Sequence, residues 1–261
     1  MPLSDADARA FARAFLDAER TRLPIEPIGE TRPELTLDDA YRIQDALVAL
    51  HVAEGLTPFG IKVGSTSKAA QRRFKTTEPV IGTLFLQRQI ANGAGVEAAR
   101  LIAPRIECEI AVRMGADLKG PDVGPEAAEA AIGSIMGAFE IIDTRTKDWR
   151  IKGVELIADN AVNAGFVLGP ERPAKGLDAA GINVMFGREG DPPTYGTGGS
   201  VLGGPKFVIA WLANWLGARG HTLKAGTVVL TGSLSEILPA AKGQRFAAKF
   251  DPLGEVAVRF E

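Results

Sequence analysis

Two glutamates stand two residues apart inside an apolar run, Pro104-Arg105-Ile106-Glu107-Cys108-Glu109-Ile110-Ala111-Val112. In a β-strand, side chains two positions apart point to the same face, so we expect Glu107 and Glu109 to lie side by side. The opposite face would carry Ile106, Cys108, Ile110 and Val112. Two like charges in a buried strand repel each other and resist the loss of water. A divalent cation is the simplest compensation, and an edge strand with two hydrated glutamates is the alternative.

A third isolated acid, Glu140, lies in another strand-like apolar run, from Gly137 to Ile142. Three carboxylates without cysteine or histidine partners are typical ligands of a hard ion such as Mg²⁺ or Mn²⁺. Three protein ligands on an octahedral ion leave about three positions for water or substrate. The sequence therefore predicts a catalytic metal site formed by Glu107, Glu109 and Glu140.

One lysine, Lys62, lies between Ile61 and Val63 in a short apolar strand that ends at Gly64. A lysine in such a place can extend its amine to solvent along its apolar stem. If it stays buried instead, it offers a cation to an anionic substrate or acts as an acid–base group. Both interpretations are open from the sequence.

The chain has 261 residues and is predicted to be an α+β protein. Residues 1–59 are expected to form a helical segment, and residues 60–261 a mixed, mostly β catalytic domain. Ser4 and Thr36 are predicted to cap two helices. A proline-rich passage, residues 24–33, separates these helices.

Short apolar runs with β-branched and aromatic residues predict the strands of the second part. They lie at 61–63, 106–114, 137–142, 164–168, 181–186, 228–231, 245–250 and 255–260. One long helix, 207–216, interrupts them after Pro205. Because strands and helices do not alternate regularly, a doubly wound parallel sheet is not expected.

Charge and hydropathy exclude several classes of function. The net charge is −2 with acids and bases mixed, which gives no sign of nucleic-acid or anionic-membrane binding. No apolar run approaches the roughly 18 residues of a membrane span, and the N-terminus lacks a signal-peptide core, so a cytoplasmic location is expected. Cys108 is the only cysteine, which excludes an internal disulfide framework and predicts a packed thiol.

Two other motifs do not match a known chemistry. The glycine-rich stretch 196–206 fails as a phosphate loop, because Lys206 follows Pro205 and no Ser or Thr comes after it. His51 and His221 are not near any paired motif, and His51 falls within the second helix rather than beside a matched glutamate. A Ser-His-Asp triad or a zinc site therefore has little support.

Seven short segments occur in an order that is typical of one family. They are 62–67 (KVGSTS), 78–82 (EPVIG), 104–109 (PRIECE), 139–143 (FEIID), 158–161 (ADNA), 211–214 (WLAN) and 230–233 (LTGS). Together they resemble the 2-keto-4-pentenoate hydratase / 2-oxohepta-3-ene-1,7-dioate hydratase / 4-oxalocrotonate decarboxylase family of the fumarylacetoacetase superfamily. The resemblance runs from about residue 36 to the C-terminus.

The resemblance implies a mixed β-roll or sandwich with flanking helices, usually in a homo-oligomer. It implies that Mg²⁺ or Mn²⁺ binds to the three carboxylates, and that Lys62 lies beside the substrate. Gly232 and Ser233 would hold the substrate carboxylate, and Ser67 is a further predicted substrate contact. A small 2-oxo or 2-hydroxy-dienoate is the implied substrate.

One position departs from the family pattern. Hydratases of the family often carry an aspartate two residues before the proline of the Pro-x-x-Gly segment, where this chain has Thr77. Glu78 stands beside it and is the candidate acid–base residue that takes over the role.

The leading hypothesis is hydration of a 2-hydroxy-2,4-dienoate to a 4-hydroxy-2-oxo acid in aromatic catabolism. The alternative is decarboxylation of a 2-oxo-enedioate such as 4-oxalocrotonate, which requires a group for the second carboxylate; Arg72, Arg73 and Arg145 are candidates. Two weaker alternatives are a C–C hydrolase of acylpyruvates and a non-catalytic partner subunit. A complex with a pathway decarboxylase or hydratase is compatible with the leading hypothesis.

Overall fold

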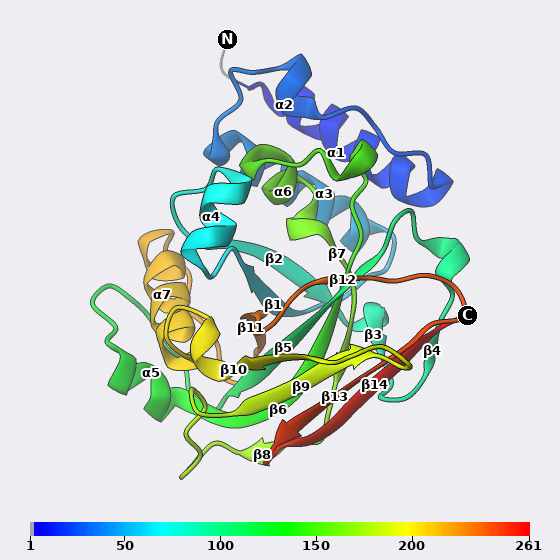
Figure 1. Ribbon diagram of the computed structural model, residues 1–261. Helices are drawn as coiled ribbons and strands as arrows, with labels where there is room; N and C mark the ends of the chain where they lie inside the picture. Colours follow the sequence, from blue (N-terminus) through cyan, green and yellow to red (C-terminus); the bar gives the residue numbers. More distant parts are fainter. Residues whose placement is uncertain (1–2) are drawn as a thin grey trace.

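The computed structural model describes residues 3–261, which form seven α-helices and fourteen strands (Figure 1). The helices are α1 (Asp5–Thr21), α2 (Ile28–Thr31), α3 (Leu37–Ala53), α4 (Lys68–Phe74), α5 (Pro125–Ala131), α6 (Gly153–Ala158) and α7 (Pro205–Ala218). The first strands are β1 (Pro58–Gly64), β2 (Val80–Phe85), β3 (Gln89–Ile90), β4 (Gly95–Val96), β5 (Arg105–Met114), β6 (Ile132–Ile142) and β7 (Asn163–Leu168). The remaining strands are β8 (Arg172–Pro173), β9 (Asn183–Arg188), β10 (Thr194–Thr197), β11 (Val228–Ser233), β12 (Leu238–Pro239), β13 (Arg245–Asp251) and β14 (Gly254–Phe260).

Two mixed sheets pack against each other. The larger sheet has the order β2-β1-β11-β5-β6-β7-β3, with β12 beside β5 and β8 beside β6. The smaller sheet has the order β10-β9-β13-β14-β4. Aromatic rings join the two sheets: Phe139 on β6 lies 5.4 Å from Phe186 on β9, measured between ring centroids. The predicted α+β class is therefore confirmed.

The alternation predicted for the acidic strand is also confirmed. Ile106, Cys108, Ile110 and Val112 all belong to the core between the sheets. The Cys108 thiol is buried, and burial raises its pKa well above the ordinary value. Glu107 and Glu109 alternate with these core residues along β5, and Glu107 pairs with Glu140 on β6.

The helical end forms a second core (top of Figure 1). Ser4 and Thr36 cap α1 and α3 as predicted, Thr36 through a reciprocal capping box with Asp39. This core includes Ile157 and Ala158 of α6 as well as residues of the first two long helices. The predicted boundary between residues 59 and 60 stays a prediction.

Several elements lay outside the sequence prediction. Strand β2 and the short helices α4, α5 and α6 were not predicted, because segments of six or seven residues carry little periodicity. Strand β6 begins at Ile132, five residues before the predicted start. Within residues 3–261, no helix is long and apolar enough to cross a membrane.

Candidate active site

Strand pairing brings the three predicted carboxylates together. Glu107 on β5 is the direct antiparallel partner of Glu140 on β6, and Glu109 follows two residues along β5. One oxygen from each carboxylate lies within 4.8 Å of those of the other two. Glu109 and Glu140 are completely buried. The cluster therefore concentrates three acids in a region with little water.

The electrostatics of the cluster favour a compensating cation. Burial raises the pKa of Glu107 to about 7, against the opposing effect of Lys62. Burial and the charges of Glu140 and Glu107 raise the pKa of Glu109 well above its ordinary range. The Oε1 atom of Glu109 is buried with no hydrogen-bond partner. An all-oxygen donor set with an unsatisfied buried oxygen fits a hard divalent ion.

The side chain of Lys62 is buried, only 4% exposed, so the solvent-directed interpretation of this lysine is wrong. Its Nζ lies 3.1 Å from Oε2 of Glu140 and donates to the carbonyl oxygen of Ala161 at 3.0 Å. Burial lowers the pKa of Lys62, but Glu140, Glu107 and Glu109 outweigh this effect and raise it. Lys62 is therefore a charged ammonium group within the acidic cluster.

A left-handed turn, Asn160–Val162, supports both Lys62 and Glu140. Its three residues have φ of 50°, 49° and 56° although none is glycine. Such backbone is strained, and β-branched residues rarely adopt it. The turn presents the Ala161 carbonyl to Lys62, and Asn163 just after it donates from Nδ2 to Oε1 of Glu140 at 2.9 Å.

A buried ion pair anchors the strained turn. Arg145 donates through Nε to Oδ1 of Asp159 at 2.5 Å and through Nη2 to the Asp159 carbonyl at 2.7 Å.

Removal of one partner of this ion pair leaves an uncompensated buried charge, which typically costs about 3–5 kcal/mol. We expect Asp159→Ala to lower the free energy of unfolding by about this amount in urea titration. Asp117→Ala, which breaks the exposed pair with Lys224, is the control and should leave stability unchanged; equal effects of the two substitutions would contradict the anchoring role.

A cavity of about 180 Å³ opens beside the carboxylates. Lys62, Glu107, Ser67 and Ser233 line it, which agrees with four of the predicted site residues. Its apolar wall consists of Phe74, Ile142, Trp149, Ile151, Leu156, Val162 and Ile237. The cavity therefore combines one polar, charged end with an apolar body, as small-ligand sites do.

Two serines of this cavity were missed at the sequence level. Ser65 and Ser235 line it, and both hydroxyl oxygens are buried without a hydrogen-bond partner. Ser65 has a φ of 54°, and Trp149, another lining residue, has a φ of 55°. Strained backbone of this kind clusters at ligand sites. The segment 62–67 carried a signal for Ser65, but only the structure shows that its hydroxyl is unpaired.

Two predicted residues occupy different places from those expected. The N–H of Gly232 donates to Oε2 of Glu109 at 2.7 Å, so this glycine holds a carboxylate rather than lining the cavity. A Cβ atom there would lie 2.2 Å from Oγ1 of Thr66, which explains why the position is glycine. Glu78 is exposed between α4 and β2 and does not line the cavity, so the geometry lends no support to its predicted catalytic role.

The prediction that His51 has no glutamate beside it is wrong. Glu19 on α1 lies beside it, with its Oε2 3.6 Å from Nε2 of the histidine. The pairing depends on how α1 packs on α3, which no local pattern reveals. Burial and the charge of Arg88 lower the pKa of His51 to about 4, and the ring does not line the cavity. A His–Glu pair that activates water at the carboxylates is therefore not formed.

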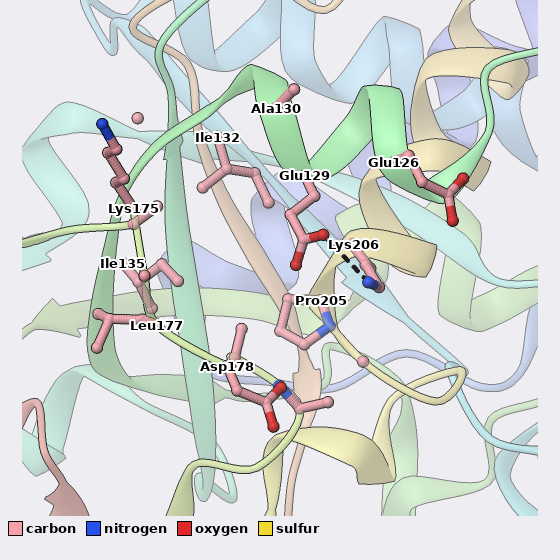
Figure 2. A pocket seen from close by; sticks show the side chains of 16 residues that line it. Glu126, Glu129, Ala130, Ile132, Ile135, Lys175, Leu177, Asp178, Pro205 and Lys206 are labelled. Carbon is pink, nitrogen blue, oxygen red and sulfur yellow. Dashed lines mark hydrogen bonds and ion pairs between the residues drawn. The ribbon is translucent and has the colours of Figure 1, made fainter.

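A larger cavity, of about 700 Å³, lies away from the carboxylates, between α5, the segment before β9 and the start of α7 (Figure 2). Its charged residues partly neutralise each other: Nζ of Lys206 lies 3.1 Å from Oε2 of Glu129. None of the predicted site residues lines it. The candidate active site is therefore the smaller cavity.

Comparisons with known proteins show which family the chain belongs to. The family model for the C-terminal part of fumarylacetoacetate (FAA) hydrolase matches residues 60–261. A 2-hydroxyhexa-2,4-dienoate hydratase of Comamonas testosteroni is 39% identical over 248 residues, 94% of each chain. A 2-oxo-hept-4-ene-1,7-dioate hydratase of Escherichia coli is 36% identical over 259 residues, 96% of each chain.

Among solved structures, 4-oxalocrotonate decarboxylase of Pseudomonas putida G7, complexed with magnesium and adipate, is similar to this chain. It has a TM-score of 0.96 and 31% sequence identity, with 99% of each chain covered. The predicted resemblance is thus confirmed along almost the whole chain. This protein belongs to the fumarylacetoacetate hydrolase family, in the group of 2-keto-4-pentenoate hydratases and 4-oxalocrotonate decarboxylases.

Proposed function

We propose that this protein is a hydro-lyase that uses Mg²⁺ or Mn²⁺ to add water to a 2-hydroxy-2,4-dienoate, which gives a 4-hydroxy-2-oxo acid. The observation that carries the proposal is the carboxylate cluster, with the buried ammonium of Lys62 beside it, at one end of a small apolar cavity. The hydratase relatives support the reaction type.

The residues that line the proposed site would have separate roles in the reaction. A divalent ion held by Glu107, Glu109 and Glu140 would supply Lewis-acid polarisation of the substrate oxygens. Lys62 has three ammonium hydrogens and uses them for two partners, so a donor remains for the substrate carboxylate or for proton transfer. The unpaired hydroxyls of Ser65 and Ser235 can also bind the carboxylate, while the apolar wall excludes water from the diene.

The proposal also covers the cellular location, the assembly and the pathway of the enzyme. We infer a cytoplasmic homo-oligomer that acts on a small-molecule dienoate in aromatic catabolism, either alone or in a complex with a pathway decarboxylase. Light scattering of the purified protein measures the subunit count.

A proton NMR time course tests the reaction. Purified protein, Mg²⁺ and freshly generated 2-hydroxypenta-2,4-dienoate should give 4-hydroxy-2-oxopentanoate, and EDTA should stop the conversion. Product that forms equally fast with EDTA would contradict the metal requirement. An untouched substrate would contradict hydration of this dienoate.

Decarboxylation of a 2-oxo-enedioate is the second candidate, favoured by the likeness to 4-oxalocrotonate decarboxylase. Loss of CO₂ from such a substrate leaves the same dienol that a hydratase consumes, so the two reactions share one binding mode. Conversion of 4-oxalocrotonate to 2-hydroxypenta-2,4-dienoate, followed by the product's signals in the same proton NMR assay, distinguishes the two candidates.

The exposed position of Glu78 gives a direct prediction. Because this side chain does not line the cavity, Glu78→Gln should keep kcat within about threefold of the wild-type value, far less than the 10²–10⁴-fold loss of a general acid or base. Steady-state kinetics of the NMR reaction, followed by absorbance, measures this. A loss of 10²-fold or more would restore Glu78 as the acid–base residue.

A further inference from the structure

Two groups hold Glu140 within the carboxylate cluster. Nζ of Lys62 lies 3.1 Å from its Oε2, and Nδ2 of Asn163 donates to its Oε1 at 2.9 Å. Glu140 and Asn163 are completely buried, so bulk water does not compete for this hydrogen bond. Asn163 is the first residue of β7 and follows directly after the strained turn Asn160–Val162. The direction of the Glu140 carboxylate therefore depends on where the backbone of Asn163 lies.

A buried arginine holds the backbone carbonyl of Asn163. Nη1 of Arg88 donates to this carbonyl oxygen at 3.2 Å, and Nη1 of Arg145 reaches it at the longer distance of 3.5 Å. Arg88 directly precedes β3, which pairs in parallel with β7, and its side chain is only 11% exposed. A guanidinium presents its donors in a rigid planar fork. The partners on one side of the Arg88 fork therefore fix where its other side points.

The counter-charge of Arg88 comes from the N-terminal helix. Nη2 of Arg88 donates to Oε1 of Glu19 on α1 at 2.6 Å. Among residues 3–261, Glu19 is the only acid within ion-pair distance of Arg88. Burial alone would raise the pKa of Glu19, but the charges of Arg88 and Arg145 outweigh burial and lower it. Glu19 is therefore an ionised carboxylate that fixes one side of the Arg88 guanidinium.

His51 on α3 is a second partner of the same guanidinium nitrogen. Its Nε2 lies 3.3 Å from Nη2 of Arg88 and 3.6 Å from Oε2 of Glu19. Because the pKa of His51 is lowered to about 4, the ring is neutral near pH 7 and can accept a hydrogen bond from the guanidinium. The two long N-terminal helices thus each supply one partner of Arg88. Both partners lie outside residues 60–261, the part of the chain that the family model matches.

We propose that Glu19 is a positioning residue of the active site, which acts through Arg88 and Asn163 on the direction of the Glu140 carboxylate. Without Glu19, the buried guanidinium would have no counter-charge and would turn toward water, so the Asn163 carbonyl would lose this donor. The inference rests on the proposed function in one respect, because a divalent ion is the ligand whose affinity depends on the direction of Glu140.

The affinity for Mn²⁺ alone, measured by calorimetric titration without substrate, tests this connection. Asn163→Ala should weaken Mn²⁺ binding by about 10- to 100-fold, as the loss of a group that orients a metal ligand does. Glu19→Ala acts from one step further away and should weaken it by about three- to 10-fold. In the Asn163→Ala background, Glu19→Ala should cause no further loss, because its effect depends on Asn163. Equal losses in the two backgrounds would overturn the proposal, since Glu19 would then act only on general stability.

Another acid of α1 provides the matched control. Asp5 lies at the opposite end of the helix and is bound by Arg42 of α3, with 2.7 Å between Oδ1 and Nη2. Asp5→Ala should leave the Mn²⁺ affinity unchanged, and an equal loss in Asp5→Ala and Glu19→Ala would contradict a specific role of Glu19. If Glu19→Ala does not fold, Glu19→Gln takes its place; it keeps an acceptor for Arg88, removes the charge and should change the Mn²⁺ affinity in the same direction.

Hydrogen exchange followed by mass spectrometry tests the connection in the metal-free protein. Glu19→Ala should speed amide exchange in residues 159–168, which contain the strained turn and β7, while Asp5→Ala should not. Unchanged exchange of this segment in Glu19→Ala would overturn the proposal. If the wild-type protein binds no Mn²⁺, the proposed metal site fails, and the exchange rates alone decide whether Glu19 holds the segment that orients Glu140.

Discussion

Glu109→Gln is expected to abolish metal binding while the metal-free protein stays folded. Gln keeps the acceptor for the Gly232 N–H but removes one of the three proposed carboxylate ligands, at a completely buried position. In wild-type protein, Mn²⁺ at 100 times its Kd should stabilise the fold by about 2.7 kcal/mol. For a chain of this size that is a rise of roughly 5–10 °C in Tm. Scanning calorimetry with and without Mn²⁺ should show this rise in the wild type and none in the variant.

Without metal, the Glu109→Gln variant should also differ from the wild type in how its free energy of unfolding depends on pH. Burial raises the pKa of Glu109, so the folded protein retains a proton over a pH range in which the unfolded chain has lost it. This contribution to stability therefore falls as pH rises from the ordinary glutamate value toward the raised pKa. Gln removes the contribution, so the metal-free variant should gain stability relative to the wild type as pH increases.

An exposed glutamate provides the control. Glu255→Gln, on β14, should change neither the Mn²⁺-induced rise in Tm nor its pH dependence. A Glu109→Gln variant that still gains the full Mn²⁺ stabilisation would remove this residue from the metal site.

The carboxylate site was largely predictable because its signal is local. Alternation along one strand predicts that Glu107 and Glu109 share a face, and an acid in an apolar run marks Glu140.

The contacts that hold the site residues in place could not be predicted from the sequence. The pairing of Glu107 with Glu140 depends on the register of two strands that residues 115–131 separate, and no local pattern fixes that register. The left-handed turn Asn160–Val162 contains no glycine, so nothing local indicates positive φ there. It persists because distant groups hold it, including the Asn160 amide, which bonds the backbone of Thr83 on β2 through both of its polar atoms. These tertiary contacts hold the turn whose Ala161 carbonyl accepts a hydrogen bond from Lys62.

Replacement of Lys62 should separate metal binding from catalysis. Its Nζ lies 3.1 Å from Oε2 of Glu140, where it would compete with the proposed metal ion for the same carboxylate. Lys62→Met should therefore bind Mn²⁺ at least as tightly as the wild type, measured by calorimetric titration. The loss of the cation beside the substrate should lower kcat by about 10²–10⁴.

Lys62→Met should lower the free energy of unfolding only when metal is absent. Without Lys62, Glu140 loses its counter-charge in a buried site, which costs about 3–5 kcal/mol in the metal-free protein. Mn²⁺ should restore most of this loss, because it supplies the missing positive charge. Lys249→Met, an exposed lysine on β13, should alter neither kcat nor the response to Mn²⁺. If Lys62→Met instead loses Mn²⁺ binding together with activity, Lys62 assembles the carboxylate cluster and does not act on the substrate; if kcat is unchanged, Lys62 has no part in the reaction.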